Sequence, residues 1–197
     1  MVLHERVAAA AEGVLPEWAC VGSKRLAHIE RVAALMDSWG SALRLDDHDR
    51  ARWRAAAYLH DALREADPEE LRAALPKPYA VLPGPVLHGP AAAERLRAEG
   101  VGDEPLLRSV AYHTVGHPDL DRMGRALYAA DFLEPGRPFL TEWRAELRAR
   151  MPEDIDEVTR EILGSRIRHL VDCGVRLLDP TVAFWNTVLD ERTAGVA

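Results

Sequence analysis

Residues 26–35 read Leu-Ala-His-Ile-Glu-Arg-Val-Ala-Ala-Leu, and this stretch sets the fold class for the whole chain. Its apolar residues recur at steps of three and four, which is the spacing of one face of an α-helix. The pattern predicts an amphipathic helix over roughly residues 22–38, with Gly40 as its stop signal. His28 lies within the same apolar pattern.

The rest of the chain repeats this helical pattern and shows clear start and stop signals. Alternating runs of β-branched residues, which would indicate strands, are missing. Pro76 to Pro85 is expected to be a loop, since prolines and a glycine crowd that stretch. Further helices are expected to begin near Asp46 or Asp47, Asp67, Asp103 and Asp121, and others to cover about residues 87–99, 139–150, 153–173 and 180–190. The sequence predicts an all-α protein, a single-domain helical bundle over residues 1–197 with about eight to ten helices.

Composition and charge narrow the functional class. The chain has 197 residues, of which 48% are hydrophobic and 29% charged, so it can bury a core as one globular unit. Its formal net charge of −7 argues against a nucleic-acid binder. A polyanionic ligand would therefore need metal ions or a few local arginines to offset its charge. No apolar run reaches the length of about 20 residues that a membrane span needs.

The two cysteines and the N-terminus bear on the compartment. Cys20 and Cys173 form no metal-binding pattern and no disulfide framework. The simplest interpretation of both is a small core residue in a reducing compartment. No secretory signal is visible at the N-terminus. We therefore expect a cytoplasmic protein.

Histidines and aspartates are spaced along successive predicted helices. The series consists of His28, His60 with the adjacent Asp61, His88, His113 and Asp131. Each gap in it holds about one helix and its connection, so each helix could direct one ligand group to a common centre. Imidazole and carboxylate groups suit zinc, manganese or iron. Five or six such groups exceed what one structural zinc needs and suit a two-metal site.

Each of these residues also has an ordinary structural explanation. A lone buried histidine is more often a core residue than a ligand, His113 could close a helix C-terminus, and Asp131 could cap the following turn. The series as a whole favours a metal centre. Three other histidines have charged neighbours and are expected at the surface: His4, His48 and His169. The sequence leaves open whether His117 reaches the site.

Several segments resemble the HD-domain metal-dependent phosphohydrolases. They are residues 27–32 (Ala-His-Ile-Glu-Arg-Val), 58–62 (Tyr-Leu-His-Asp-Ala), 87–90 (Leu-His-Gly-Pro), 113–116 (His-Thr-Val-Gly) and 127–137 (Leu-Tyr-Ala-Ala-Asp-Phe-Leu-Glu-Pro-Gly-Arg). Their order and the last block are similar to the YqeK branch of that family, the symmetrical bis(5′-nucleosyl)-tetraphosphatases. The motif-bearing core covers about residues 20–150. C-terminal helices cover about 151–197, and the tail beyond about 160 has no counterpart and no assigned role.

The resemblance implies two divalent metal ions, iron first, with manganese, cobalt or zinc as alternatives. One ion would be bound by His28, His60, Asp61 and Asp131, and Asp61 would bridge to a second ion held with His88 and His113. Asp61 and Arg64 would be catalytic, and the substrate would be bound by Arg64, Thr114 and Arg137. The family often has lysine at the position of Arg64, which replaces a point charge with a planar guanidinium.

The activity that the resemblance implies is hydrolysis of dinucleoside tetraphosphate, such as diadenosine tetraphosphate to two ADP, by a hydroxide that the two ions activate. One alternative is another HD-type phosphohydrolase, such as a nucleoside monophosphate phosphatase, which would share the ligands and release free phosphate. A non-catalytic nucleotide sensor and a purely structural protein are the others. The expected partner is a small nucleotide, with no nucleic acid and no membrane, and the oligomeric state is left open, a homodimer being one option.

Overall fold

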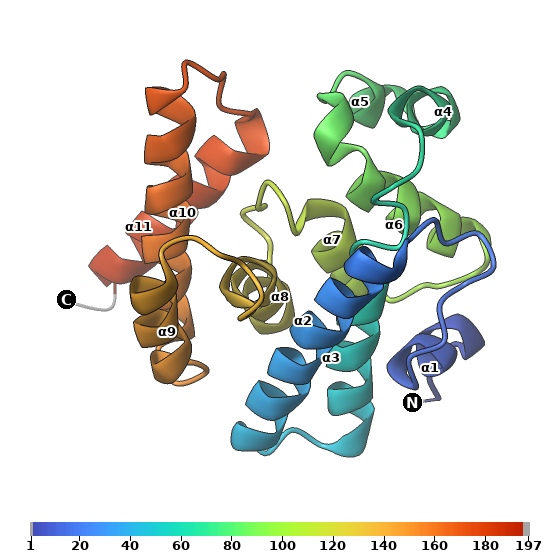
Figure 1. The fold of residues 1–197 in the computed structure, drawn as a ribbon, viewed down its shortest axis with the longest axis horizontal. Helices are drawn as coiled ribbons and strands as arrows, with labels where there is room; N and C mark the ends of the chain where they lie inside the picture. Colours follow the sequence, from blue (N-terminus) through green and yellow to red (C-terminus); the bar gives the residue numbers. More distant parts are fainter. Residues whose placement is uncertain (1, 195–197) are drawn as a thin grey trace.

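The computed structural model describes residues 2–194 and consists of helices and their connections (Figure 1). The described part contains no strand, which confirms the all-α class. The α-helices are α1 (Glu5–Ala11), α2 (Ser23–Ala42), α3 (Asp47–Leu59), α4 (Pro68–Ala74), α5 (Lys77–Ala80), α6 (His88–Ala98), α7 (Glu104–Tyr112), α8 (Arg122–Leu133), α9 (Thr141–Arg150), α10 (Ile155–Asp172) and α11 (Asp179–Ala194). A short 3₁₀ helix, η1, covers Gly84–Val86.

The predicted aspartate caps are confirmed at four helix starts. Each of these side chains accepts a hydrogen bond from a backbone N–H two or three residues later, a group that would otherwise lack a partner in the first turn. The capping residues are Asp46 for α3, Asp67 for α4, Asp103 for α7 and Asp121 for α8. These caps explain why the boundaries of the corresponding helices could be read from the sequence.

The expected helix count was too low, because the sequence did not predict two short α-helices and one 3₁₀ helix. Helix α1 has only seven residues, too few to display a helical period. Helix α5 and η1 lie inside the proline-rich stretch that was expected to be a loop, where proline occupies a first-turn position of each. The prediction that Gly40 ends the helix that begins near residue 22 was also wrong. Helix α2 passes through it to Ala42, and Gly40 is buried where the Arg50 and Leu45 side chains approach its backbone.

Helix α8 runs through the middle of the molecule. Every residue from Met123 to Leu133 is buried, so the helix has no solvent-facing side. It packs against α2, α3 and α7 and, through its remaining surface, against α9 and α10. Figure 1 shows α8 between the α2–α3 pair and the C-terminal helices α9, α10 and α11. Two charged residues of α8, Arg125 and Asp131, are consequently held inside the protein, whereas Arg122 at its start is exposed.

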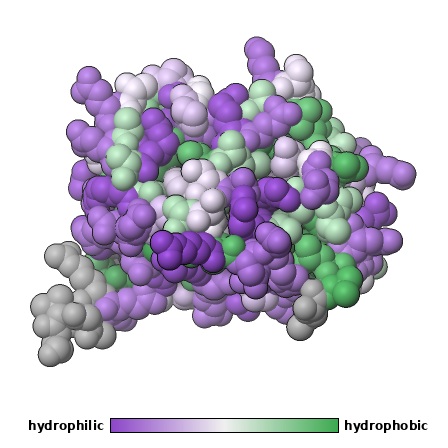
Figure 2. Space-filling view, turned by 90° about the horizontal axis from the view of Figure 1, so that it is seen from below, coloured by the Kyte–Doolittle hydropathy of each residue, from purple (hydrophilic) through white to green (hydrophobic). Residues whose placement is uncertain are grey.

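The cysteine prediction was wrong in one respect. Cys20 and Cys173 are free thiols as expected, but both are exposed. Cys20 lies in the connection before α2, and Cys173 is the C-terminal cap of α10, so neither position belongs to a core-facing helical stripe. In the described residues, no helix is both long and apolar enough to cross a membrane. The face in Figure 2 is mostly hydrophilic and carries scattered apolar residues, an ordinary pattern for a surface in water.

Candidate metal centre

Asp61 is the centre of the candidate site. It lies in the turn that follows α3 and is 3% exposed. One carboxylate oxygen, Oδ1, is 3.1 Å from His88 Nε2 and 3.5 Å from His113 Nε2. The other oxygen, Oδ2, is 3.5 Å from Nε2 of both His28 and His60. The two oxygens of Asp61 therefore each face a separate pair of imidazoles.

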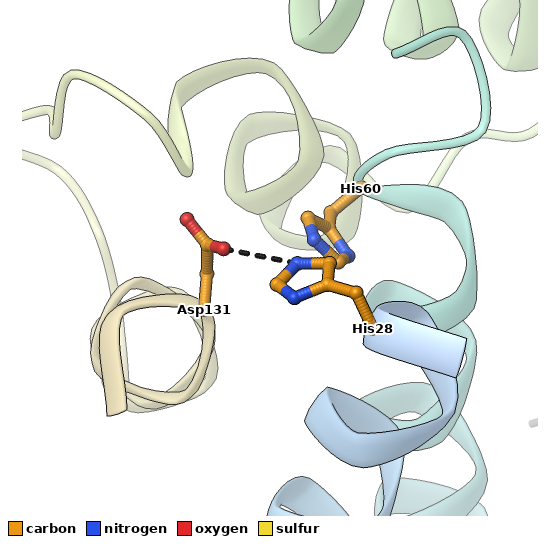
Figure 3. A group of neighbouring side chains, drawn as sticks. All are labelled: His28, His60 and Asp131. Carbon is orange, nitrogen blue, oxygen red and sulfur yellow. Dashed lines mark ion pairs between the residues drawn. The ribbon is translucent and has the colours of Figure 1, made fainter. Parts of the chain in front are cut away.

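A second carboxylate completes the group around His28 and His60. Asp131 extends from α8, with its Oδ1 3.2 Å from His28 Nε2. Figure 3 shows the three side chains converging from α2, the end of α3 and α8. Their nearest ligand atoms lie within 4.8 Å of one another, which fits coordination of a single ion. We call these six residues the ligand cluster: His28, His60, Asp61, His88, His113 and Asp131.

The outward nitrogens of three rings are fixed by hydrogen bonds. Nδ1 of His60 donates to the Ala57 carbonyl at 2.6 Å, and Nδ1 of His113 donates to the Val110 carbonyl at 2.8 Å, because a carbonyl oxygen can only accept. His28 Nδ1 is 3.2 Å from a carboxylate oxygen of Glu134. These partners orient the rings and leave the Nε2 lone pairs directed at the centre, as in metal-binding histidines.

The unpartnered nitrogens test whether this cluster fits metal ions. Nε2 of His28 and of His60 is buried and makes no hydrogen bond within residues 2–194. Nε2 of His88 and Nε2 of His113 face each other at 3.1 Å. Because Nδ1 of His113 carries the proton of the neutral ring, its Nε2 has no proton and carries a free lone pair. Buried lone pairs of this kind are costly without a proton or a cation, so the cluster fits divalent ions.

The protonation states agree with a cation site. Burial would raise the pKa of Asp61, but His60 and the other surrounding histidines hold it well below its usual range. Burial also opposes ionisation of Asp131, yet His28 and Arg137 lower its pKa strongly. Burial lowers the pKa of His88 to about 4, so this ring is neutral at pH 7. Burial also lowers the pKa of His60, but the Asp61 carboxylate more than reverses this effect, so the net shift of that pKa is upward.

The ligand cluster opens into a cavity of about 610 Å³, here called the main cavity. This volume is within the range of small-molecule sites. Four arginines line it, although the protein as a whole is negatively charged. They are Arg25, Arg64, Arg137 and Arg166. Local positive charge of this kind is what a polyphosphate would require.

Two of these arginines contact the carboxylates of the ligand cluster. Arg25 Nη1 is 2.7 Å from Asp61 Oδ2, and Arg137 pairs with Asp131 through Nη2 and with its carbonyl through Nε. Arg137 was predicted to bind substrate, whereas Arg25 was missed. The signal for Arg25 was its place three residues before His28, since residues three apart share one face of a helix.

The far side of the main cavity comes from α10, a region to which the sequence assigned no role. Four residues of this helix form what we call the C-terminal wall: Ser165, Arg166, His169 and Leu170. The Arg166 guanidinium lies 5.2 Å above the ring centroid of Tyr128, and its Nη2 donates to the Thr114 carbonyl at 2.6 Å. His169 is exposed, as predicted, but it borders the cavity.

The segment from Glu134 to Leu140, which carries Arg137, is held by a buried arginine that sequence reasoning overlooked. Arg144 of α9 is 1% exposed, and its guanidinium lies 5.0 Å from the Phe132 ring centroid and 4.7 Å from that of Phe139. Its amino groups reach three carbonyls of the segment at 3.4 Å, those of Glu134, Arg137 and Phe139. Burial lowers the pKa of Arg144 to about 10, which leaves it charged at neutral pH. A charge-rich helix gave no hint that this arginine points inward.

The remaining predicted residues are placed as follows. Arg64 lines the main cavity, and its guanidinium makes no ion pair with any described residue. Thr114 also lines it, with Oγ1 3.0 Å from His113 Nε2. His117 does not line the cavity, and its ring contacts that of Tyr112 in a tilted arrangement, with 4.4 Å between centroids. Another acidic and histidine group, Asp46 with His48 and Asp49, lies at the surface around the start of α3.

Both the sequence and the fold of this chain are similar to those of known proteins. The sequence pattern of the HD domain family matches residues 25–136. Three relatives are named symmetrical bis(5′-nucleosyl)-tetraphosphatase. The protein of Halalkalibacterium halodurans is 25% identical over 150 residues, covering 73% of this chain and 79% of that one. The Staphylococcus aureus protein is 29% identical, with coverages of 54% and 57%, and the Bacillus subtilis protein is 30% identical, with coverages of 46% and 52%.

A solved structure shares the fold over nearly the whole length. It is described as a predicted HD superfamily hydrolase involved in NAD metabolism, from Clostridium acetobutylicum. The two superimpose with a TM-score of 0.76 at 22% identity, covering 97% of this chain and 99% of the other. The overlap therefore includes α9, α10 and α11. With the matched pattern extending over more than half of its residues, the chain belongs to the HD domain family of metal-dependent phosphohydrolases.

Proposed function

We propose that this protein hydrolyses dinucleoside tetraphosphates symmetrically, releasing two nucleoside diphosphates. The observation that carries the proposal is the position of Asp61. Its two oxygens face two pairs of histidines, and it borders a cavity that four arginines line. Such a site combines cation ligands with binding groups for a chain of phosphates. The shared name of the three relatives supports this choice of substrate.

The ligand cluster would hold two divalent ions, with Asp61 shared between them. His28, His60 and Asp131 would complete one set of ligands, and His88 and His113 the other. Iron is our first choice, and the same donors also suit manganese, cobalt and zinc. When bound, such ions acidify a water molecule and offset the charge of phosphate oxygens.

The arginines of the main cavity would bind and orient the tetraphosphate. Arg64 is the strongest candidate to contact phosphate, because its guanidinium has no ion-pair partner within residues 2–194. Arg137 already pairs with Asp131 and would contact phosphate oxygens from the same position. Charge that builds up on the departing diphosphate would be stabilised by these guanidinium groups, which are held in place before the reaction. The Thr114 hydroxyl, beside His113, would donate a hydrogen bond to the substrate.

The test is a product analysis with the protein loaded in turn with iron, manganese, cobalt and zinc. Diadenosine tetraphosphate is the substrate, and chromatography identifies the nucleotides formed. We expect ADP as the sole nucleotide product and about two ions per chain. ATP with AMP would contradict symmetrical cleavage, and no turnover with any ion would contradict the proposed substrate.

Two variants make the test specific. Asp61→Ala removes the shared carboxylate, so both ions and the activity should be lost together. His48→Ala provides the matched control, because His48 belongs to the partly exposed group at the start of α3 and not to the ligand cluster. The control should keep both its metal content and its activity. Loss of activity in His48→Ala would show that the assay reports general instability.

A further inference from the structure

A second cavity, of about 410 Å³, lies beside the main cavity among α9, α10 and α11. Two tryptophans line it, Trp143 from α9 and Trp185 from α11, and both side chains are partly exposed. We call it the tryptophan groove. Nothing in the proposed chemistry of the ligand cluster uses it. Partly exposed indoles that line a concave surface are a common feature of sites that bind planar rings.

The tryptophan groove is continuous with the main cavity. Leu140 and Ser165 line both of them. Leu140 is 54% exposed and adopts φ 49° and ψ 40°, a left-handed conformation that is rare for a bulky residue. Such conformations persist only where surrounding structure holds them, and they concentrate at functional sites. A ligand in the main cavity could therefore extend past Leu140 into the groove.

The groove also has the chemistry of a nucleoside site. Trp185 packs over Gly164 of α10, where a Cβ would approach the indole to 3.3 Å, so the glycine allows the ring to lie close to the helix. Trp143 is fixed by an edge contact with Phe132, at 6.0 Å between centroids. Arg168 lines the groove, and its guanidinium forms no ion pair with another described residue. Flat apolar surface beside an unpaired cation suits a base joined to a sugar phosphate.

We propose that the tryptophan groove binds one nucleoside of the dinucleoside tetraphosphate, with its base stacked on Trp185. This inference rests on the proposed function. A substrate that is cut at its midpoint has two equal arms extending from the reacting phosphates, so it needs two separate places for its bases. The main cavity, which holds the ligand cluster and the arginines, accommodates one arm, and the groove receives the base of the other.

The test compares a substrate that has two nucleosides with one that has a single nucleoside. Diadenosine tetraphosphate and adenosine 5′-tetraphosphate are each assayed with the wild type and with Trp185→Ala. Loss of one stacked base should raise the KM for diadenosine tetraphosphate about tenfold and leave its kcat unchanged. The KM for adenosine tetraphosphate should not change, because that molecule can bind without using the groove. Trp185→Phe keeps an aromatic face and should restore most of the lost affinity.

Trp18→Ala is the matched control. Trp18 is also partly buried, donates a hydrogen bond to Glu99 and lines neither cavity, so its removal should alter neither KM. Thermal melting of each variant shows whether it is folded. If Trp185→Ala leaves both KM values unchanged, the groove binds no base, and if it raises both equally, Trp185 acts on the main cavity.

Failure of the proposed function would give a result that differs from failure of the groove inference. In that case the wild type would hydrolyse neither nucleotide, and equilibrium dialysis of the same two nucleotides would decide the inference. Tighter binding of diadenosine tetraphosphate, lost in Trp185→Ala, would support the groove as a nucleoside site. Equal binding of both nucleotides to the wild type would overturn it.

Discussion

The ligand cluster and the C-terminal wall face the same cavity but are held in different ways. Each histidine of the ligand cluster is at most 6% exposed, and three of them are fixed by a second hydrogen bond or ion pair from Nδ1. The wall residues on α10 are exposed or partly exposed, and Arg166 is tied to the opposite side by one hydrogen bond to Thr114. Metal chemistry requires ligands fixed to fractions of an ångström, whereas a substrate-facing wall can adjust.

The sharpest test of this contrast replaces one histidine on each side. His88→Ala removes a ligand-cluster ring that lies 3.1 Å from Asp61, and His169→Ala removes a ring from the wall. We expect His88→Ala to lower kcat/KM by about a thousandfold or more and to reduce the metal content from two ions to one. His169→Ala should lower kcat/KM by less than about tenfold and keep both ions. Similar losses in the two variants would break the distinction.

Arg137 stands at the junction of the two sides and should show an intermediate effect. Its guanidinium both pairs with Asp131 and faces the main cavity. Arg137→Ala is expected to reduce kcat/KM by about a hundredfold, since it would remove the proposed phosphate contact and leave the Asp131 carboxylate without its guanidinium partner. Steady-state kinetics at saturating metal measures the loss. Full activity in this variant would assign phosphate binding to the other arginines.

Arg166 tests the wall alone. Arg166→Ala removes one cation from the main cavity and the hydrogen bond to the Thr114 carbonyl. We expect KM to rise about tenfold with little change in kcat, because ground-state binding is lost while the ligand cluster stays intact. Arg95→Ala is a matched control, since that guanidinium also lies over an aromatic ring, 5.7 Å from the centroid of Trp18, outside the cavity. A fall in kcat or in metal content would show that the wall also positions the ligand cluster.

Arg144 should affect stability more than activity. Arg144→Leu removes the guanidinium that lies over Phe132 and Phe139 and contacts three carbonyls of the segment before α9. We expect the free energy of unfolding to fall by about 2 kcal/mol. Urea denaturation measures this change, and Arg150→Leu, which removes a partly exposed arginine of the same helix and its ion pairs with Asp154 and Glu161, should cost less than about 1 kcal/mol. An unchanged stability would mean that burial of the charge cancels its contacts.

The helices and the ligand cluster could be predicted because their signals are local or ordered. Aspartate caps mark the starts of four helices, and the fold brings together the six histidines and aspartates that the sequence predicted as metal ligands. Arg25 and Arg166 escaped prediction, because an arginine that points into a cavity has the same local pattern as one that points into water. The inward turn of Arg144 depends on Phe132 and Phe139, whose approach is set by tertiary packing.

His60 and His113 each donate from Nδ1 to a carbonyl three residues earlier, at the ends of α3 and α7. Carbonyls in the last turn have no partner within their own helix, so each ring both completes a helix end and is immobilised by it. The rings consequently lose their rotational entropy when the chain folds and not when an ion arrives. A cluster stiffened in advance cannot readily expand or contract. Such a cluster would select among ions by their radius and by the number of ligands that each prefers.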